Sequence, residues 1–154
     1  MSHVPRILII DDNPLEADLL TQAFAAARWE VSLEDHTRAD SALPALAAHA
    51  SAGTSPDLIL LDVTLYGQPS VPVLAAIRTL DRPGKKQAVI VMSNVNPTPA
   101  IQHQYREQEA FQIIQKFSDG QSLRNFVLHL RQILTADGII AVDGSAVDGD
   151  SSRS

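Results

Sequence analysis

The chain has 154 residues, of which 45% are hydrophobic and 19% are charged, and its formal net charge at pH 7 is −6. This length suits one domain with a core of its own. An acidic chain lacks the basic surface that carries most of the affinity for nucleic acid, so nucleic-acid binding is not expected. The absence of cysteine excludes disulfides and thiolate zinc sites. The first apolar run, Ile7–Ile10, is too short for a signal peptide or a membrane span, so we expect a cytoplasmic protein.

Short apolar runs alternate along the chain with longer segments whose apolar residues recur at the helical period. The short runs have the composition of strands, most of them buried on both faces. They are Arg6–Ile10, Trp29–Leu33, Asp57–Leu61, Gln87–Met92 and Phe111–Gln115. A helix is predicted after each strand. The helices begin at Pro14, with Asn13 as N-cap, and then cover Thr37–Ala50, Pro69–Leu80, Pro97–Glu109 and Ser118–Thr135.

Alternating strands and helices predict a parallel sheet with helices on both of its faces, because parallel strands need right-handed crossover connections. The common solution at this size is a doubly wound (βα)5 fold of the flavodoxin-like type, with strand order 2-1-3-4-5. We expect one domain over residues 1–137, with Gly138 ending the last helix. Residues 138–154 are rich in Gly, Ser and Asp, which predicts a largely disordered tail.

Polar residues follow four of the predicted strands at the point where each strand ends. Asp11 and Asp12 follow the first strand, Asp62 the third, Ser93 the fourth and Lys116 the fifth. In an open α/β sheet, ligands collect outside the carboxyl ends of the strands, so these side chains should meet at one site. Taken singly, each is an ordinary turn residue, cap or solvated side chain. Their convergence on one edge favours a functional site.

Three carboxylates at one site repel one another and favour a hard divalent cation, and so few protein ligands suit Mg²⁺. A carboxylate beside Mg²⁺ can attack phosphorus to form an aspartyl phosphate. The ion, a lysine and a hydroxyl would then each stabilise one phosphoryl oxygen. Asp62, Lys116 and Ser93 supply the side chains that this chemistry requires.

The motifs at these strand ends resemble those of bacterial response-regulator receiver domains, the CheY-like family. They are ILIIDD at Ile7–Asp12, PDLILLD at Pro56–Asp62, VIVMS at Val89–Ser93, and Lys116 after the last strand. The resemblance covers about residues 5–135, with the motifs in the family's order. It implies the CheY-like fold and a regulatory phosphoacceptor rather than an enzyme.

By this resemblance, Asp62 is the phosphate acceptor. Asp11 and Asp12 bind Mg²⁺, Asp12 directly and Asp11 through water, and Thr64 offers its backbone carbonyl to the ion. Asp62 is a ligand of the same ion.

The resemblance also gives roles to the other two strand-end residues and to a partner. Ser93 is the switch hydroxyl that moves onto the phosphoryl group, and Lys116 pairs with a phosphoryl oxygen. The donor in the family is a phosphohistidine on a sensor histidine kinase.

The sequence departs from the family's pattern at three positions. Phe117 follows the lysine, where the family usually has proline, and the usual aromatic switch position holds Ile113. After Asp62 the family commonly has Met-Pro, where this chain reads Leu65-Tyr66. These changes leave the phosphorylation chemistry in place and alter the expected output mechanism.

The opening segment Asp11–Phe24 resembles the stand-alone receivers that partner phytochrome kinases, so the partner kinase is expected to be a bacteriophytochrome. The family's usual dimer face is made by the fourth helix, the fifth strand and the fifth helix. Phe111, Phe117 and the apolar segment Ile139–Val142 lie on or near that face, which predicts a homodimer.

Two other functions remain open. A small phosphatase of the haloacid-dehalogenase type also uses an aspartate after a strand, but it needs a second aspartate two residues later, where this chain has Thr64. A phosphorylation-independent interaction module on the same fold would accommodate the three departures. A flavodoxin-type flavin carrier needs a Ser/Thr/Gly-rich phosphate loop after the first strand, and it is set aside because the carboxylates of DDNP would repel a phosphate. A P-loop protein is set aside because no P-loop motif occurs.

Overall fold

The computed structural model describes residues 3–136. Within this range, five parallel strands form one sheet in the order β2-β1-β3-β6-β7. Their bounds are Arg6–Ile10 for β1, Ser32–His36 for β2, Leu58–Asp62 for β3, Val89–Ser93 for β6 and Gln112–Gln115 for β7. With the strands of this sheet counted in chain order, this is the predicted order 2-1-3-4-5. The flavodoxin-like (βα)5 fold is therefore confirmed.

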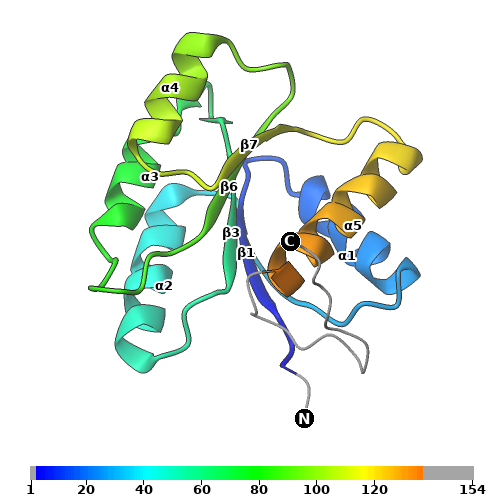
Figure 1. Ribbon diagram of the computed structural model, residues 1–154, viewed down its shortest axis with the longest axis horizontal. Helices are drawn as coiled ribbons and strands as arrows, with labels where there is room; N and C mark the ends of the chain where they lie inside the picture. The colour runs from blue at the N-terminus through cyan, green and yellow to red at the C-terminus, as the bar shows by residue number, and fades with distance from the viewer. Residues whose placement is uncertain (1–2, 137–154) are drawn as a thin grey trace.

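Five helices in the described range cover both faces of the sheet. Figure 1 shows α1 and α5 on one face and α2, α3 and α4 on the other. Their bounds are Leu15–Ala26 for α1, Ala39–Ala52 for α2, Val71–Arg78 for α3, Pro99–Glu107 for α4 and Gly120–Ala136 for α5. No helix among residues 3–136 is long and apolar enough to cross a membrane.

The alternation of side chains along the strands divides the core into two clusters. Ile7 and Ile9 of β1 point to the face of α1 and α5, where Leu130 is fully buried. Leu8 and Ile10 point to the other face, against helices α2 and α3. Every residue of β3 and β6 is buried, because both strands lie inside the sheet with helices on either side. This rigid centre carries the strand ends that the sequence singles out.

The second strand lies three residues later than predicted. Trp29 is only 6% exposed, but it is buried beside Phe24, with the two rings edge to face at 5.4 Å, and not as part of a strand. The strand that pairs with β1 is the more polar Ser32–His36 at the edge of the sheet. The predicted bounds Trp29–Leu33 were wrong, because the alternation of apolar and polar residues begins before the strand, whereas the predicted position near an edge is confirmed.

The remaining differences lie at element ends and in one loop. Helix α2 continues to Ala52, and Gly53 ends it in the left-handed region at φ 73°. A short antiparallel hairpin, β4 (Thr64–Leu65) and β5 (Gln68–Pro69), follows β3 and was not predicted. The predicted tail, 138–154, and the predicted helix end at Gly138 lie outside the described residues.

Candidate functional site

Three carboxylates meet at the carboxyl edge of the sheet. Asp11 follows β1 and Asp62 is the last residue of β3, and they are 1% and 3% exposed. Asp12 is half-buried beside them. Each of the three offers an oxygen that lies within 4.8 Å of the others. Such a set of hard oxygen donors suits a divalent cation such as Mg²⁺.

The lysine that follows β7 lies among these acids. Lys116 Nζ is 2.7 Å from Asp11 Oδ2 and 3.1 Å from Asp62 Oδ2, and the lysine side chain is only 6% exposed. Its backbone N–H donates to the Ser93 carbonyl at 2.7 Å, which fixes the start of this loop to the end of β6. The structure therefore brings together the acids and the lysine that follow the strands, as the sequence predicted.

The electrostatics of the pocket follow from burial and from these contacts. Burial and then the charge of Asp11 raise the pKa of Asp62 to about 6, although Lys116 opposes this change. Burial alone would lower the pKa of Lys116, but its hydrogen bond with Asp11 and the charges of both acids raise it. The lysine is therefore charged, and Asp62 holds its negative charge only at a cost.

Glu16 is a fourth acid of the site that the strand ends did not indicate. It lies in the first turn of α1, is 9% exposed, and places Oε1 at 3.3 Å from Lys116 Nζ. The sequence gives no direct signal for it, because α1 begins only at Leu15 and Asp12 lies before the helix. Carboxylates therefore outnumber the lysine in this pocket.

Ser93 and Thr64 border the pocket, and their side chains are not hydrogen-bond partners of Lys116 Nζ. Ser93 is 2% exposed at the end of β6, and its hydroxyl donates to the Val95 carbonyl at 2.6 Å. Thr64 is exposed, and its backbone N–H lies 3.4 Å from Asp62 Oδ1. The serine hydroxyl is thus turned toward its own loop in this structure.

A buried tyrosine that the strand ends did not indicate fixes the loop after Asp62. Tyr105 of α4 is 1% exposed and donates from its hydroxyl to the Val63 carbonyl at 2.9 Å. Its oxygen also lies 2.9 Å from Ser70 Oγ and accepts the Ser70 N–H at 3.2 Å. Helix α4 is therefore tied directly to the residue next to Asp62.

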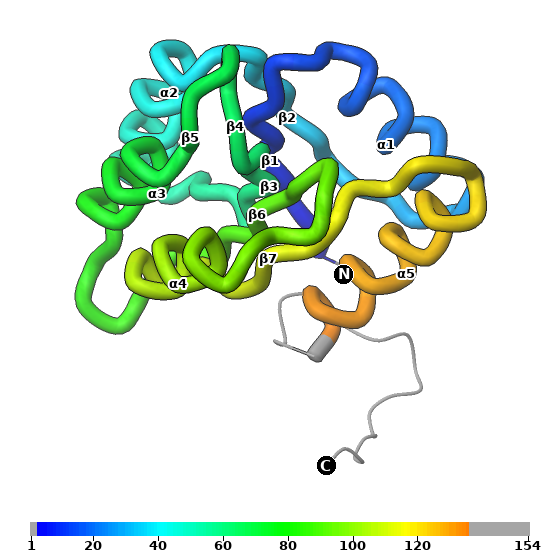
Figure 2. Tube along the Cα trace, turned by 90° about the horizontal axis from the view of Figure 1, so that it is seen from above, coloured from blue at the N-terminus to red at the C-terminus, as the bar shows by residue number. Residues whose placement is uncertain are grey.

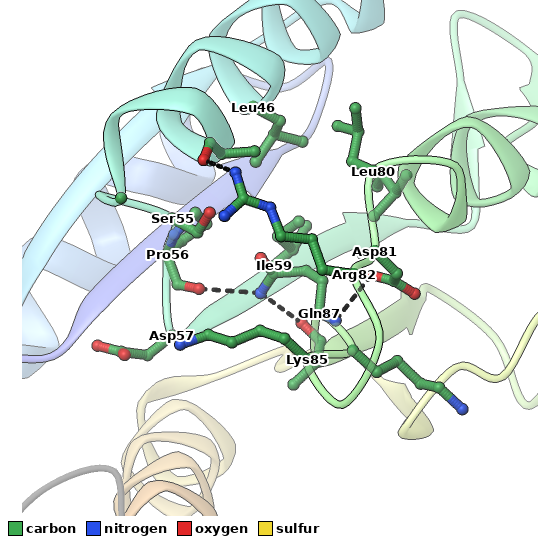
Figure 3. Close-up of a pocket in the computed structure, with 15 residues that line it drawn as sticks. Leu46, Ser55, Pro56, Asp57, Ile59, Leu80, Asp81, Arg82, Lys85 and Gln87 are labelled. Carbon is green, nitrogen blue, oxygen red and sulfur yellow. Dashed lines mark hydrogen bonds between the residues drawn. The ribbon is translucent and has the colours of Figure 1, made fainter.

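A cavity of about 470 Å³ lies at the opposite, amino edge of the sheet. Figure 3 shows Leu46, Ile59 and Leu80 along it, with Arg82 and Gln87 crossing it. Arg82 donates to the Ala50 carbonyl, and the Gln87 amide donates to the Pro56 carbonyl at 2.9 Å. These polar groups bind backbone of the same fold, which identifies them as structural.

The doubly wound sheet and the acidic pocket at its carboxyl edge define a flavodoxin-like domain of the CheY-like class. The family model of the response regulator receiver domain matches residues 7–128, which is more than half of the chain. The chain therefore belongs to the response regulator receiver domain family.

Solved structures with the same fold include response regulators of light signalling. The phosphorylated cyanobacterial phytochrome response regulator RcpA is 22% identical, with a TM-score of 0.70 over 91% of this chain and 100% of that one. Response regulator RPA3017 of R. palustris red-light signalling is 17% identical, with a TM-score of 0.69 over 96% and 100%. A CheY-like receiver domain protein of Methanospirillum hungatei is 20% identical, with a TM-score of 0.68 over 89% and 98%. Among curated proteins, none matches this sequence.

Proposed function

We propose that this chain is a response regulator receiver that accepts a phosphoryl group on Asp62 from the phosphohistidine of a sensor histidine kinase. The observation that carries the proposal is the position of Lys116 Nζ, within 3.1 Å of Asp62 and 2.7 Å of Asp11. A buried lysine that faces several carboxylates can form an ion pair with a phosphoryl oxygen when a phosphoryl group enters the pocket.

Mg²⁺ is the proposed cofactor, with Asp11, Asp12, Asp62 and the Thr64 carbonyl as the groups that would hold it. The ion would neutralise charge on the phosphoryl oxygens and orient them. The proximity of the three carboxylates, all within 4.8 Å, supports this assignment. Thr64 follows Asp62 by two residues and begins the hairpin that borders the pocket.

The chain's own residues would carry out the transfer as follows. A carboxylate oxygen of Asp62 attacks phosphorus, the bond from phosphorus to the histidine nitrogen breaks, and its electron pair stays on the imidazole. Lys116 pairs with one phosphoryl oxygen. The Ser93 hydroxyl, which donates to the Val95 carbonyl at 2.6 Å in this structure, would turn to donate to another. The transfer makes the protein a regulatory phosphoacceptor without turnover of a substrate.

The test is chemical phosphorylation. With acetyl phosphate and Mg²⁺, we expect the intact mass to increase by one phosphoryl group. The increase should be absent in Asp62→Asn, which differs from the wild type at the proposed acceptor alone. An unchanged mass in the wild type under these conditions would contradict the proposal. Continuous release of many phosphates per protein from a phosphate monoester would instead favour the phosphatase.

A bacteriophytochrome is the proposed partner kinase. The support is the resemblance of Asp11–Phe24 to receivers that partner phytochrome kinases, together with the fold shared with two light-signalling regulators. Two leucines of α1, the helix that carries Glu16, are exposed, Leu15 at 62% and Leu19 at 40%, and such apolar surface suits a protein donor. Phosphotransfer from purified candidate kinases, measured with Leu15→Glu as the variant, tests this surface.

We propose that the receiver domain extends over residues 1–137. We also propose that phosphorylation signals through a homodimer formed by α4, β7 and α5. On this face Phe111 is 46% exposed, and Ile113 and Ile114 line a hollow of about 470 Å³ at the sheet's edge strand. If the dimer forms there, Phe111→Glu should shift the molar mass in light scattering from dimer to monomer. Normal dimerisation and partner binding by Asp62→Asn would favour the phosphorylation-independent module.

A further inference from the structure

A hydrogen bond joins the hairpin after Asp62 to the acid Asp12 of the pocket. The backbone N–H of Tyr66 donates to Asp12 Oδ2 at 2.7 Å. The two residues are 54 positions apart, so this contact links the loop after β1 to the loop after β3. Figure 2 shows the β4–β5 hairpin standing above the carboxyl ends of these strands. A hydrogen bond from an N–H to a carboxylate is charge-assisted and short, and it fixes the orientation of the acid.

The geometry of the turn explains why this N–H is available. Tyr66 and Gly67 have φ values of 52° and 78°, and they connect the closing pair Leu65–Gln68. Positive φ at both central residues defines a type I′ turn. The hydrogen bond that closes such a turn uses the flanking residues, which leaves the first central N–H free to point outward. Here it points at Asp12.

Tyr66 adopts this conformation against its own preference. A bulky aromatic residue at positive φ is unusual, because the left-handed region favours Gly, Asn and Asp. The residue is 57% exposed, and the Arg38 guanidinium lies 5.6 Å from the ring centre. Arg38 in turn forms two hydrogen bonds with Asp40, at 2.9 and 2.7 Å. Arg28 and Glu109 also have positive φ, so what distinguishes Tyr66 is its contact with Asp12 rather than the strain alone.

We propose that the Tyr66 backbone N–H is a positioning group for Mg²⁺, holding the Asp12 carboxylate in the orientation in which it binds the ion. The inference rests on the proposed function, because Asp12 is a proposed ligand there. It also explains why this chain has tyrosine and not proline at position 66, since proline would have no N–H to donate. Groups that orient a ligand from behind commonly change metal affinity by about tenfold to a hundredfold.

The first experiment measures Mg²⁺ affinity by calorimetry in three proteins. Relative to the wild type, Tyr66→Pro removes the donor and should weaken binding by about tenfold. Tyr66→Asn keeps the N–H and places the residue most favoured before Gly in this turn, so it should bind as the wild type does. Rescue by asparagine separates the backbone donor from the ring and from Arg38.

A matched pair of glycines controls for damage to the fold. Gly67 and Gly84 have φ values of 78° and 74°, and an added Cβ at either position meets nothing within 4 Å. Alanine therefore strains both turns equally. Gly67→Ala should weaken Mg²⁺ binding because it distorts the turn that presents the N–H. Gly84→Ala, in the turn before β6, should leave the affinity unchanged.

An amide measurement on the wild type gives a readout independent of any variant. The Tyr66 amide proton should exchange slowly with solvent, and its chemical shift should move during a Mg²⁺ titration with the dissociation constant found by calorimetry. A Tyr66 amide that exchanges freely and does not move would overturn the inference, as would equal affinities in the wild type and Tyr66→Pro. Absence of Mg²⁺ binding by the wild type would overturn the proposed function together with the inference.

Discussion

The two edges of the central sheet hold charged residues in opposite ways. At the amino edge, Arg82 and Gln87 line a cavity of about 470 Å³ and donate to backbone carbonyls. At the carboxyl edge, Lys116 is 6% exposed and its partners in the pocket are the carboxylates of Asp11, Glu16 and Asp62. At the amino edge these polar groups stabilise the fold by hydrogen bonds to the backbone. At the carboxyl edge the carboxylates outnumber the lysine.

This difference shows why size alone does not locate a functional site. The amino-edge cavity is large, but Arg82 and Gln87 within it already donate to backbone carbonyls, which a ligand of these groups would have to displace. The carboxyl-edge pocket has one cation for several buried acids, so its energy improves when another cation enters. An excess of one charge among buried groups is therefore the better indicator of function here.

The largest expected effect follows from removing the cation at the carboxyl edge. Lys116→Met leaves buried carboxylates without their counter-charge, which should lower the free energy of unfolding by about 3–5 kcal/mol at pH 7 without Mg²⁺. Urea unfolding measures the change. Millimolar Mg²⁺ should restore part of the loss, because the ion replaces the missing positive charge. Stability equal to that of the wild type would contradict the charge imbalance.

A smaller effect is expected from pH. The pKa of Asp62 is raised to about 6, above its ordinary 3.8, so the folded state binds this proton more tightly than the unfolded state. Stability is therefore greater below pH 4 than above pH 6 by about 2–3 kcal/mol from this group, and it falls as the pH rises through this window.

Asp62→Asn provides the control for the pH effect, because asparagine does not titrate. Without Mg²⁺, the difference in unfolding free energy between the wild type and this variant should change between pH 4 and pH 6 and be constant above that range. Urea unfolding of both proteins at each pH gives the difference directly. A difference that is independent of pH would show that burial and the charge of Asp11 do not raise the pKa of Asp62.

The strand ends were predictable from the sequence because parallel strands place their carboxyl ends at one edge whatever the details of packing. Asp11, Asp62 and Lys116 follow buried apolar runs, and the structure brings them together. Glu16 depends on the rotation of α1 relative to β1, which no strand-end pattern fixes. Its place in the first turn of α1 became informative only when the helix was placed.

Two other features lay beyond the pattern of the sequence for physical reasons. The β4–β5 hairpin requires Tyr66 at φ 52°, which residue preferences argue against, and tertiary contacts with Asp12 and Arg38 compensate for it. The second strand, Ser32–His36, is polar because it lies at the sheet's edge, while the apolar Trp29 before it fills a gap beside Phe24. Propensity gives way to packing in both places.

The smallest effect is expected from the cation at the amino edge. Arg82 is exposed and donates to the Ala50 carbonyl, so Arg82→Met removes a solvent-screened hydrogen bond without leaving a buried charge. We expect a loss of no more than about 1 kcal/mol in urea unfolding. The same replacement of a cation by methionine thus has unequal costs at the two edges. Mg²⁺ should stabilise Arg82→Met by as much as the wild type, because this edge takes no part in binding the ion. If Arg82→Met were as damaging as Lys116→Met, the amino edge would also hold a charge that the fold must neutralise.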